Sequence, residues 1–277
     1  FLSFRRLRER DAPEAAPRTL RAAGGGRAVR ALALVLVLLA SPAAAHCRLA
    51  LVLALDVSSS VNSKEYAIQL GGLVDALRRP EVVEAILSPA GTGVAVLAFE
   101  WSGADHQRVI AGWSTLDSPG AVAAFADRLS AHRRTADDQS TAIGSALAYA
   151  AGRFADAPVC GQRTIDISGD GNNNEGPHPE DLRATGLFDG ITINGLVIQG
   201  AYPNPVIFYR SYVMQGPEAF VAMARDFDDY PPVIIGKLLR ELDVQGPVGA
   251  VPRRRGGIEL TAASGTPGST CPAAQSC

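Results

Sequence analysis

Continuous apolar runs and runs with helical spacing alternate along most of this chain. Four runs are apolar without alternation, which is typical of strands buried on both faces; they cover residues 48–55, 93–99, 163–168 and 191–198. A fifth run, residues 107–113, alternates apolar and polar positions like an edge strand.

Between these runs, apolar residues recur every three or four positions, as they do along one face of a helix. Helices are expected over residues 63–79, 122–129, 143–154, 217–227 and 232–242. Strands that alternate with helices predict an α/β fold, a doubly wound, mostly parallel sheet with helices on both faces. Ligands of such sheets bind beyond the carboxyl ends of the strands, where the strand order reverses.

The beginning and the end of the chain differ in composition from this central part. Arg27 and Arg30 precede an apolar run over residues 31–40, and small residues follow it, as in a secretory signal peptide. That run is too short to span a bilayer comfortably. We expect an N-terminal extension and signal peptide over residues 1–45, one domain over 46–244, and a disordered tail over 245–277.

Removal of the first 45 residues would change the charge. Subtracting their eight Arg and three acidic residues from the 26 basic and 28 acidic residues of the chain leaves 18 and 25, a net charge of −7. An acidic exported protein is a poor candidate for nucleic acid or anionic lipid, and we expect no nucleic-acid partner and no stable membrane span after signal cleavage. Residues 1–26 represent either an over-extended gene start or a genuine extension of the signal segment.

All four cysteines lie after residue 45, and an even number in an oxidising compartment suggests disulfides. Cys47 lies nine residues before Asp56, and Cys160 lies ten residues before Asp170. If the strands that end at these acids are parallel neighbours, the two cysteines meet at the opposite edge of the sheet. We expect a Cys47–Cys160 disulfide, with the other two cysteines closing a small loop in the tail; the alternative is that Cys47 and Cys160 are reduced.

Oxygen-bearing side chains gather at the predicted strand ends. Asp56, Ser58 and Ser60 follow the first strand at alternate positions, and alternate residues of an extended segment point the same way. Thr141 opens a helix, and Asp170 ends a later strand. Carboxylate and hydroxyl oxygens suit Mg²⁺, or Mn²⁺ or Ca²⁺. Each segment alone is typical of a helix cap or a turn, but together they favour one cation site.

In order and context, these three segments resemble the metal-ion-dependent adhesion site of von Willebrand factor A domains. In that family Asp-x-Ser-x-Ser, a Thr and an Asp-Gly come from three loops. The runs over residues 166–174, 193–196 and 216–220 resemble more closely the DUF1194 family of exported bacterial proteins, which has no assigned function. The resemblance therefore implies a fold and a site, and no biological role.

The resemblance also implies a role for each residue of the site. Ser58 and Ser60 would bind the cation through their hydroxyls, and Thr141 would bind directly or through water. Asp56 and Asp170 would bind mostly through water and supply negative charge. The cation could then take a carboxylate from a partner as its last ligand, which implies protein binding.

Four further residues are candidates for the rim of the site. Asn172 and Asn173 follow Asp170, although such a run is also typical of a loop that tolerates left-handed backbone. Glu100 and Trp101 follow the second strand on the same side of the sheet. For Trp101, the alternative is an aromatic side chain half-packed on the surface.

We therefore expect an exported metal-dependent module, periplasmic or secreted, that captures an acidic residue of a partner protein. A metal-assisted hydrolase using the same site is the alternative. A scaffold whose metal only stabilises a loop is a third hypothesis. The sequence holds no Gly-x-Ser-x-Gly, Ser-x-x-Lys, His-Glu-x-x-His or Walker motif, and its four His are scattered, which favours binding over catalysis.

Overall fold

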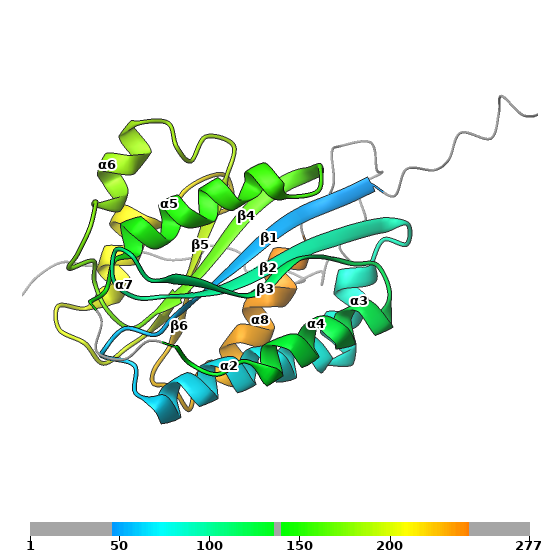
Figure 1. Cartoon of the computed structure of the whole chain (residues 1–277), viewed down its shortest axis with the longest axis horizontal. Coiled ribbons are helices and arrows are strands. Elements are labelled where there is room, and N and C mark those ends of the chain that lie inside the picture. The colour runs from blue at the N-terminus through cyan, green and yellow to red at the C-terminus, as the bar shows by residue number, and fades with distance from the viewer. Residues whose placement is uncertain (1–45, 136–139, 244–277) are drawn as a thin grey trace, which may run out of the picture. The chain divides into compact units, whose positions relative to one another are not determined.

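A six-stranded sheet runs through the centre of the computed structural model, which describes residues 46–135 and 140–243 (Figure 1). The strands are β1 (His46–Asp56), β2 (Thr92–Trp101), β3 (Gln107–Leu116), β4 (Cys160–Gly169), β5 (Thr192–Ile198) and β6 (Val221–Ala224). They lie in the order β3-β2-β1-β4-β5-β6, with only β2 and β3 antiparallel. The predicted doubly wound α/β fold is confirmed, and the expected edge strand is β3.

Helices cover both faces of this sheet (Figure 1). One face carries α2 (Ser63–Arg78), α3 (Pro80–Leu87), α4 (Pro119–Ala131) and α8 (Tyr230–Leu242). The other face carries α5 (Ile143–Arg153), α6 (Pro179–Ala184) and α7 (Pro205–Phe208), and α7 continues into a π-helical turn, η2 (Tyr209–Val213).

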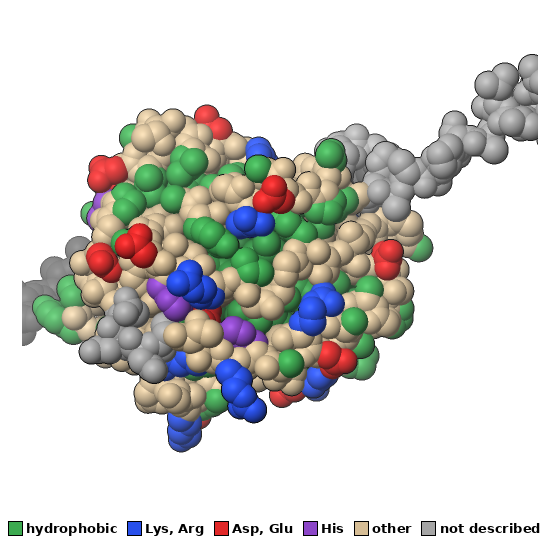
Figure 2. Space-filling view, viewed as in Figure 1, with side chains coloured by type: hydrophobic (Ala, Val, Ile, Leu, Met, Phe, Trp, Pro, Cys, Tyr) green, Lys and Arg blue, Asp and Glu red, His purple; other side chains and the backbone are tan. Residues whose placement is uncertain are grey.

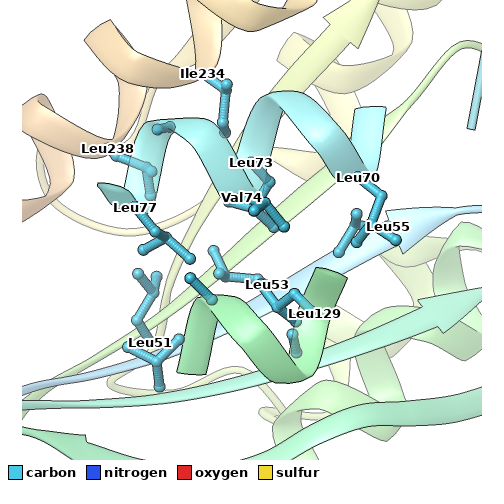
Figure 3. Close-up of a cluster of buried hydrophobic side chains, with 14 of the residues drawn as sticks. Leu51, Leu53, Leu55, Leu70, Leu73, Val74, Leu77, Leu129, Ile234 and Leu238 are labelled. Atoms are coloured by element: carbon cyan, nitrogen blue, oxygen red, sulfur yellow. The ribbon is translucent and has the colours of Figure 1, made fainter. Parts of the chain in front are cut away.

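Each face of the sheet packs against its own apolar core, and β1 contributes to both. Leu51, Leu53 and Leu55 point toward α2, α4 and α8, as Figure 3 shows. Val52 and Ala54 belong to the second core, beneath α5. Successive residues of a strand point to opposite faces, so a strand buried on both sides needs a continuous apolar sequence.

The start of α2 is fixed by a capping box. The Asn62 side chain accepts hydrogen bonds from the backbone N–H groups of Lys64 and Glu65, and the Glu65 carboxylate accepts from the Asn62 N–H. Pro80 ends this helix as predicted and also begins α3, where its missing N–H costs no hydrogen bond. The cap sets the point at which the loop after β1 stops.

Residues 217–227 do not form the expected helix, and this prediction was wrong. Val221–Ala224 is strand β6, which pairs in parallel with β5. The apolar stretch is too short to sustain a helix alone, and Glu218 just before it has a left-handed backbone with φ of 59°. Pairing with the open edge of β5 therefore decides the conformation.

A disulfide joins Cys47 to Cys160, as predicted. The two residues are register partners at the beginnings of β1 and β4. The remaining cysteines, the predicted signal segment and the predicted tail lie outside the described residues.

The surface carries charges of both signs. Figure 2 shows acidic and basic side chains interspersed over the face that it views. Within residues 46–135 and 140–243, no helix combines the length and apolar character that a membrane span requires.

A buried ion cluster connects α8 to the sheet. The Lys237 ammonium lies 2.6 Å from Asp166 Oδ1 and 2.5 Å from Glu241 Oε1, and all three side chains are buried. Asn194 Nδ2 donates to Glu241 Oε1 at 3.0 Å, and Asn194 Oδ1 accepts from the Phe220 N–H. One cation thus faces two carboxylates. Burial, and then repulsion from Asp166, raise the pKa of Glu241 to about 7.

We expect the free energy of unfolding to fall as the pH rises from 4.5 to about 7, because the folded protein holds the Glu241 proton more tightly than the unfolded chain does. The Glu241→Gln variant should lose part of this dependence, on the order of 1 to 3 kcal/mol. Denaturant titrations across this pH range measure it. Glu84→Gln, at an exposed position of α3, should keep the wild-type slope. Equal slopes in Glu241→Gln and the wild type would contradict this account.

Candidate metal centre

The predicted site residues lie where the strand order reverses. From β1 the chain builds outward to β2 and β3 on one side, and later to β5 and β6 beyond β4 on the other. The carboxyl ends of β1 and β4 therefore meet at a switch point, at the left of the sheet in Figure 1. Asp56 is the last residue of β1, and Asp170 directly follows β4.

The loop after β1 brings its oxygens to the end of β4. Asp56 Oδ1 accepts a hydrogen bond from the Ser58 N–H at 2.7 Å, which fixes the turn. The hydroxyl oxygens of Ser58 and Ser60 are 3.1 Å apart. Ser60 Oγ then donates to Asp170 Oδ1 at 2.6 Å. Four of the five predicted ligands are therefore linked in one hydrogen-bonded chain.

Thr141 approaches the same place from a third loop. Its N–H donates to Asn174 Oδ1 at 2.8 Å, and its carbonyl oxygen accepts from the Asn174 N–H at 2.9 Å. The Thr141 hydroxyl oxygen lies 3.5 Å from the position that a Cβ on Gly171 would take. Thr141 is thus held against the loop that carries Asp170. Helix α5 begins only at Ile143, so Thr141 is free of the capping role that its sequence context also allowed.

The two carboxylates of the site repel each other. Asp56 has no exposed surface, and burial, followed by the charge of Asp170, raises its pKa to about 7. Burial also raises the pKa of Asp170. The second carboxylate oxygen of Asp56, Oδ2, is buried without a hydrogen-bond partner among the described residues. A divalent cation between these loops would offset both costs, so the residues fit Mg²⁺, Mn²⁺ or Ca²⁺.

The site combines carboxylate and hydroxyl oxygens. Across the described ranges, no three His, Cys, Asp or Glu side chains gather in a way that could hold a metal ion. At this position the two carboxylates are accompanied by the hydroxyl groups of Ser58 and Ser60, and Thr141 is held against the loop after β4.

A protein family matches this sequence along most of the chain. Residues 46–246 match the family described as "Protein of unknown function (DUF1194)". The chain belongs to the DUF1194 family. The resemblance seen in the sequence is thereby confirmed. No curated protein matches this DUF1194 chain.

Three solved structures are similar to this DUF1194 chain over 71% of its length. The pilus adhesin SpaC from Lactobacillus rhamnosus GG, in its open conformation, is 12% identical with a TM-score of 0.50, over 71% of this chain and 30% of that one. A von Willebrand factor type A from Catenulispora acidiphila is 17% identical with a TM-score of 0.49, over 71% and 43%. Proximal thread matrix protein 1 from the mussel byssus, with a zinc-occupied MIDAS motif, is 20% identical with a TM-score of 0.48, over 71% and 46%.

At 12% identity, the likeness to SpaC concerns the fold alone. The DUF1194 chain spans less than half of the length of the first structures that it matches. What those proteins bind is therefore no finding about this chain.

Asn172 and Asn173, two of the candidate rim residues, brace the loops beside the site. Asn172 Nδ2 donates to the Pro203 carbonyl oxygen at 3.0 Å. Asn173 Oδ1 accepts from the Gly144 N–H in the first turn of α5, also at 3.0 Å. Their side-chain groups thus connect loops from different parts of the chain.

Glu100 and Trp101 do not lie on the rim, and this expectation was wrong. Both belong to β2, which runs two residues beyond the predicted strand, and neither has any exposed surface. Trp101 packs in the core beneath α5, so it is not half-packed on the surface either. Glu100 points to the opposite face, where it accepts from the Tyr66 hydroxyl at 3.0 Å and contacts His132 Nε2 at 2.9 Å.

Arg134 holds the first loop of the site, and no sequence motif pointed to it. Its guanidinium donates to the carbonyl oxygens of Val57 at 3.0 Å, Ser58 at 3.3 Å, and Val61. The Thr135 N–H next to it donates to the Glu100 carboxylate at 3.1 Å. The segment after α4 therefore ties the loop that carries Ser58 to strand β2.

We expect Arg134→Ala to loosen the loop after β1, because three backbone carbonyls lose a charged donor. Hydrogen exchange of a peptide over residues 56–62 should become roughly ten-fold faster or more. Arg133→Ala, at the exposed neighbouring position, is the matched control and should leave exchange unchanged. Wild-type exchange rates in Arg134→Ala would show that the guanidinium does not hold the loop.

Proposed function

We propose that this DUF1194 chain is an exported protein-binding module that captures an acidic side chain of a partner through a divalent cation held by three loops. The observation that carries the proposal is the position of Ser60, whose hydroxyl oxygen lies 3.1 Å from Ser58 Oγ and 2.6 Å from Asp170 Oδ1. This places neutral hydroxyls and a carboxylate at one point of the switch-point edge. Mg²⁺ is the proposed cation, with Mn²⁺ or Ca²⁺ as alternatives.

The neutral hydroxyls and the charged carboxylates would bind the cation in different ways. Ser58 and Ser60 would hold the cation directly, Thr141 directly or through water, and Asp56 and Asp170 mostly through water. When bound, the cation supplies an open coordination position for a carboxylate from outside. Hydroxyl ligands leave its charge less neutralised than carboxylate ligands would, so an acidic side chain is the favoured last ligand.

A groove gives a partner access to the site. It has a volume of about 540 Å³, and Ser60 and Asp170 form part of its wall together with Lys64, Asp226 and Asp228. A groove of this size admits a protruding side chain and its neighbours. This supports binding of a protein loop or chain end.

The alternative, a metal-assisted hydrolase, has less support. Three of the histidines are engaged away from the site: His106 and His132 contact Glu100, and His178 packs against Phe208 and Tyr212. A hydrolase would need a general base within hydrogen-bond reach of the attacking water. Asp56 and Asp170, the two carboxylates of the proposed site, are already assigned to holding the cation.

Export is supported by the chemistry of the cysteines. The Cys47–Cys160 disulfide is typical of proteins in an oxidising compartment. Together with the signal-like segment over residues 27–45, it supports a periplasmic or secreted location.

The cation site predicts a specific loss of Mg²⁺ binding. Wild-type protein should bind one Mg²⁺ in a calorimetric titration, and Asp56→Ala should bind none that is detectable. Ser58→Ala combined with Ser60→Ala should fail likewise, because the hydroxyl ligands are gone. Circular dichroism should show that both variants are folded.

Ser59→Ala is the matched control, because Ser59 is exposed and lies between the two proposed ligands. It should bind Mg²⁺ like the wild type. Unchanged Mg²⁺ affinity in Asp56→Ala and in the double serine variant would refute the assignment of these residues as ligands. The same variants test the capture of a partner. A periplasmic protein that binds to the wild type and to Ser59→Ala should no longer bind when chelator is added, or when Asp56→Ala replaces the wild type. Capture that chelator does not affect would contradict the role of the cation.

A further inference from the structure

A buried tyrosine hydroxyl without a partner lies beneath the proposed metal site. Tyr209 is the first residue of the π-helical turn η2 and has no exposed surface. Its Oη lacks a hydrogen-bond partner within the part of the chain that the structure describes, and the same holds for Asp56 Oδ2. An unpaired buried polar atom is costly, so two such atoms in one place call for an explanation.

Tyr209 Oη and Asp56 Oδ2 lie close to each other, beside the backbone of Gly169. A Cβ on this residue would come within 2.6 Å of Tyr209 Oη and within 2.8 Å of Asp56 Oδ2. Both oxygens therefore occupy the space that a side chain at position 169 would fill. Gly169 directly precedes Asp170, so this space is the floor of the site.

A second glycine makes room for the tyrosine ring. A Cβ on Gly195 would lie 2.6 Å from Tyr209 Cδ1. Gly195 on β5 pairs with Ile167 on β4, two residues before Gly169. The two glycines thus form a slot that admits one large side chain, and the slot aims its hydroxyl toward Asp56. Single π-helical turns such as η2 occur frequently at functional sites.

We propose that Tyr209 is a positioning residue of the metal centre, whose hydroxyl donates a hydrogen bond to one buried water molecule that in turn donates to Asp56 Oδ2. This rests on the proposed function. Asp56 Oδ1 is already held by the Ser58 N–H at 2.7 Å, so a donor on Oδ2 fixes the orientation of the carboxylate. An ordinary tyrosine hydroxyl carries its proton at neutral pH, so it can act as the donor.

The Tyr209→Phe variant removes only the hydroxyl. We expect its Mg²⁺ affinity to fall about ten-fold or more, as for other residues that orient a metal ligand, while circular dichroism shows a folded protein. A merely structural hydroxyl would lower the melting temperature in chelator and leave the Mg²⁺ affinity at the wild-type value. Tyr230→Phe, which removes another buried tyrosine hydroxyl on the opposite face of the sheet, should leave Mg²⁺ affinity unchanged.

A second measurement needs no metal. In chelator, the unfolding equilibrium constants of the wild type, Tyr209→Phe, Asp56→Asn and the double variant form a cycle. We expect the two substitutions to be coupled by about five-fold or more, because the groups interact.

The possible outcomes separate three claims: the contact between Tyr209 and Asp56, the positioning role of Tyr209, and the proposed function. Additive effects in the cycle would overturn the contact, whether or not Mg²⁺ binds. Coupling together with wild-type Mg²⁺ affinity in Tyr209→Phe would overturn the positioning role. Coupling in a wild-type protein that binds no Mg²⁺ would support the contact and contradict the proposed function instead.

Discussion

The parallel pairing of β1 with β4 is the constraint on which the rest of this structure depends. Its register runs from Cys47 opposite Cys160 to Leu55 opposite Ser168. At one end it places the cysteines for their disulfide, and at the other it brings the loops of Asp56 and Asp170 together. A slip of one residue would turn every side chain of the strand to the opposite face and would disrupt both ends.

The apolar cores keep that register, and polar side chains then shape the loops beyond it. Arg134 holds the carbonyl groups of the first loop, and Asn174 holds Thr141 against the loop after β4. This arrangement brings the carboxylates of Asp56 and Asp170 close together in a buried place, which is unfavourable without a counter-ion. Such departures from the rules of polar burial are typical of functional sites.

The sequence was sufficient to predict those elements and site residues that depend on a local pattern of apolar and polar positions. Continuous apolar runs predicted the parallel strands, and the alternate spacing of Asp56, Ser58 and Ser60 predicted which side chains gather at the end of β1. Features that depend on distant partners were not predictable. β6 forms because the edge of β5 is open, and Glu100 and Trp101 are buried because β2 continues past its apolar run. Arg134 and Tyr209 belong to no motif, and only the fold brings them to the site.

The central claim is that three loops at this switch point build one site for a divalent cation. Crystals of the protein grown with Mn²⁺ test it most directly, because anomalous scattering locates the ion without assumptions about its ligands. We predict a single strong peak at the end of β1, within bonding distance of the Ser58 and Ser60 hydroxyl oxygens and next to Thr141 and Asp170. A structure at saturating Mn²⁺ without a peak there, or with Mn²⁺ bound only elsewhere, would contradict the account.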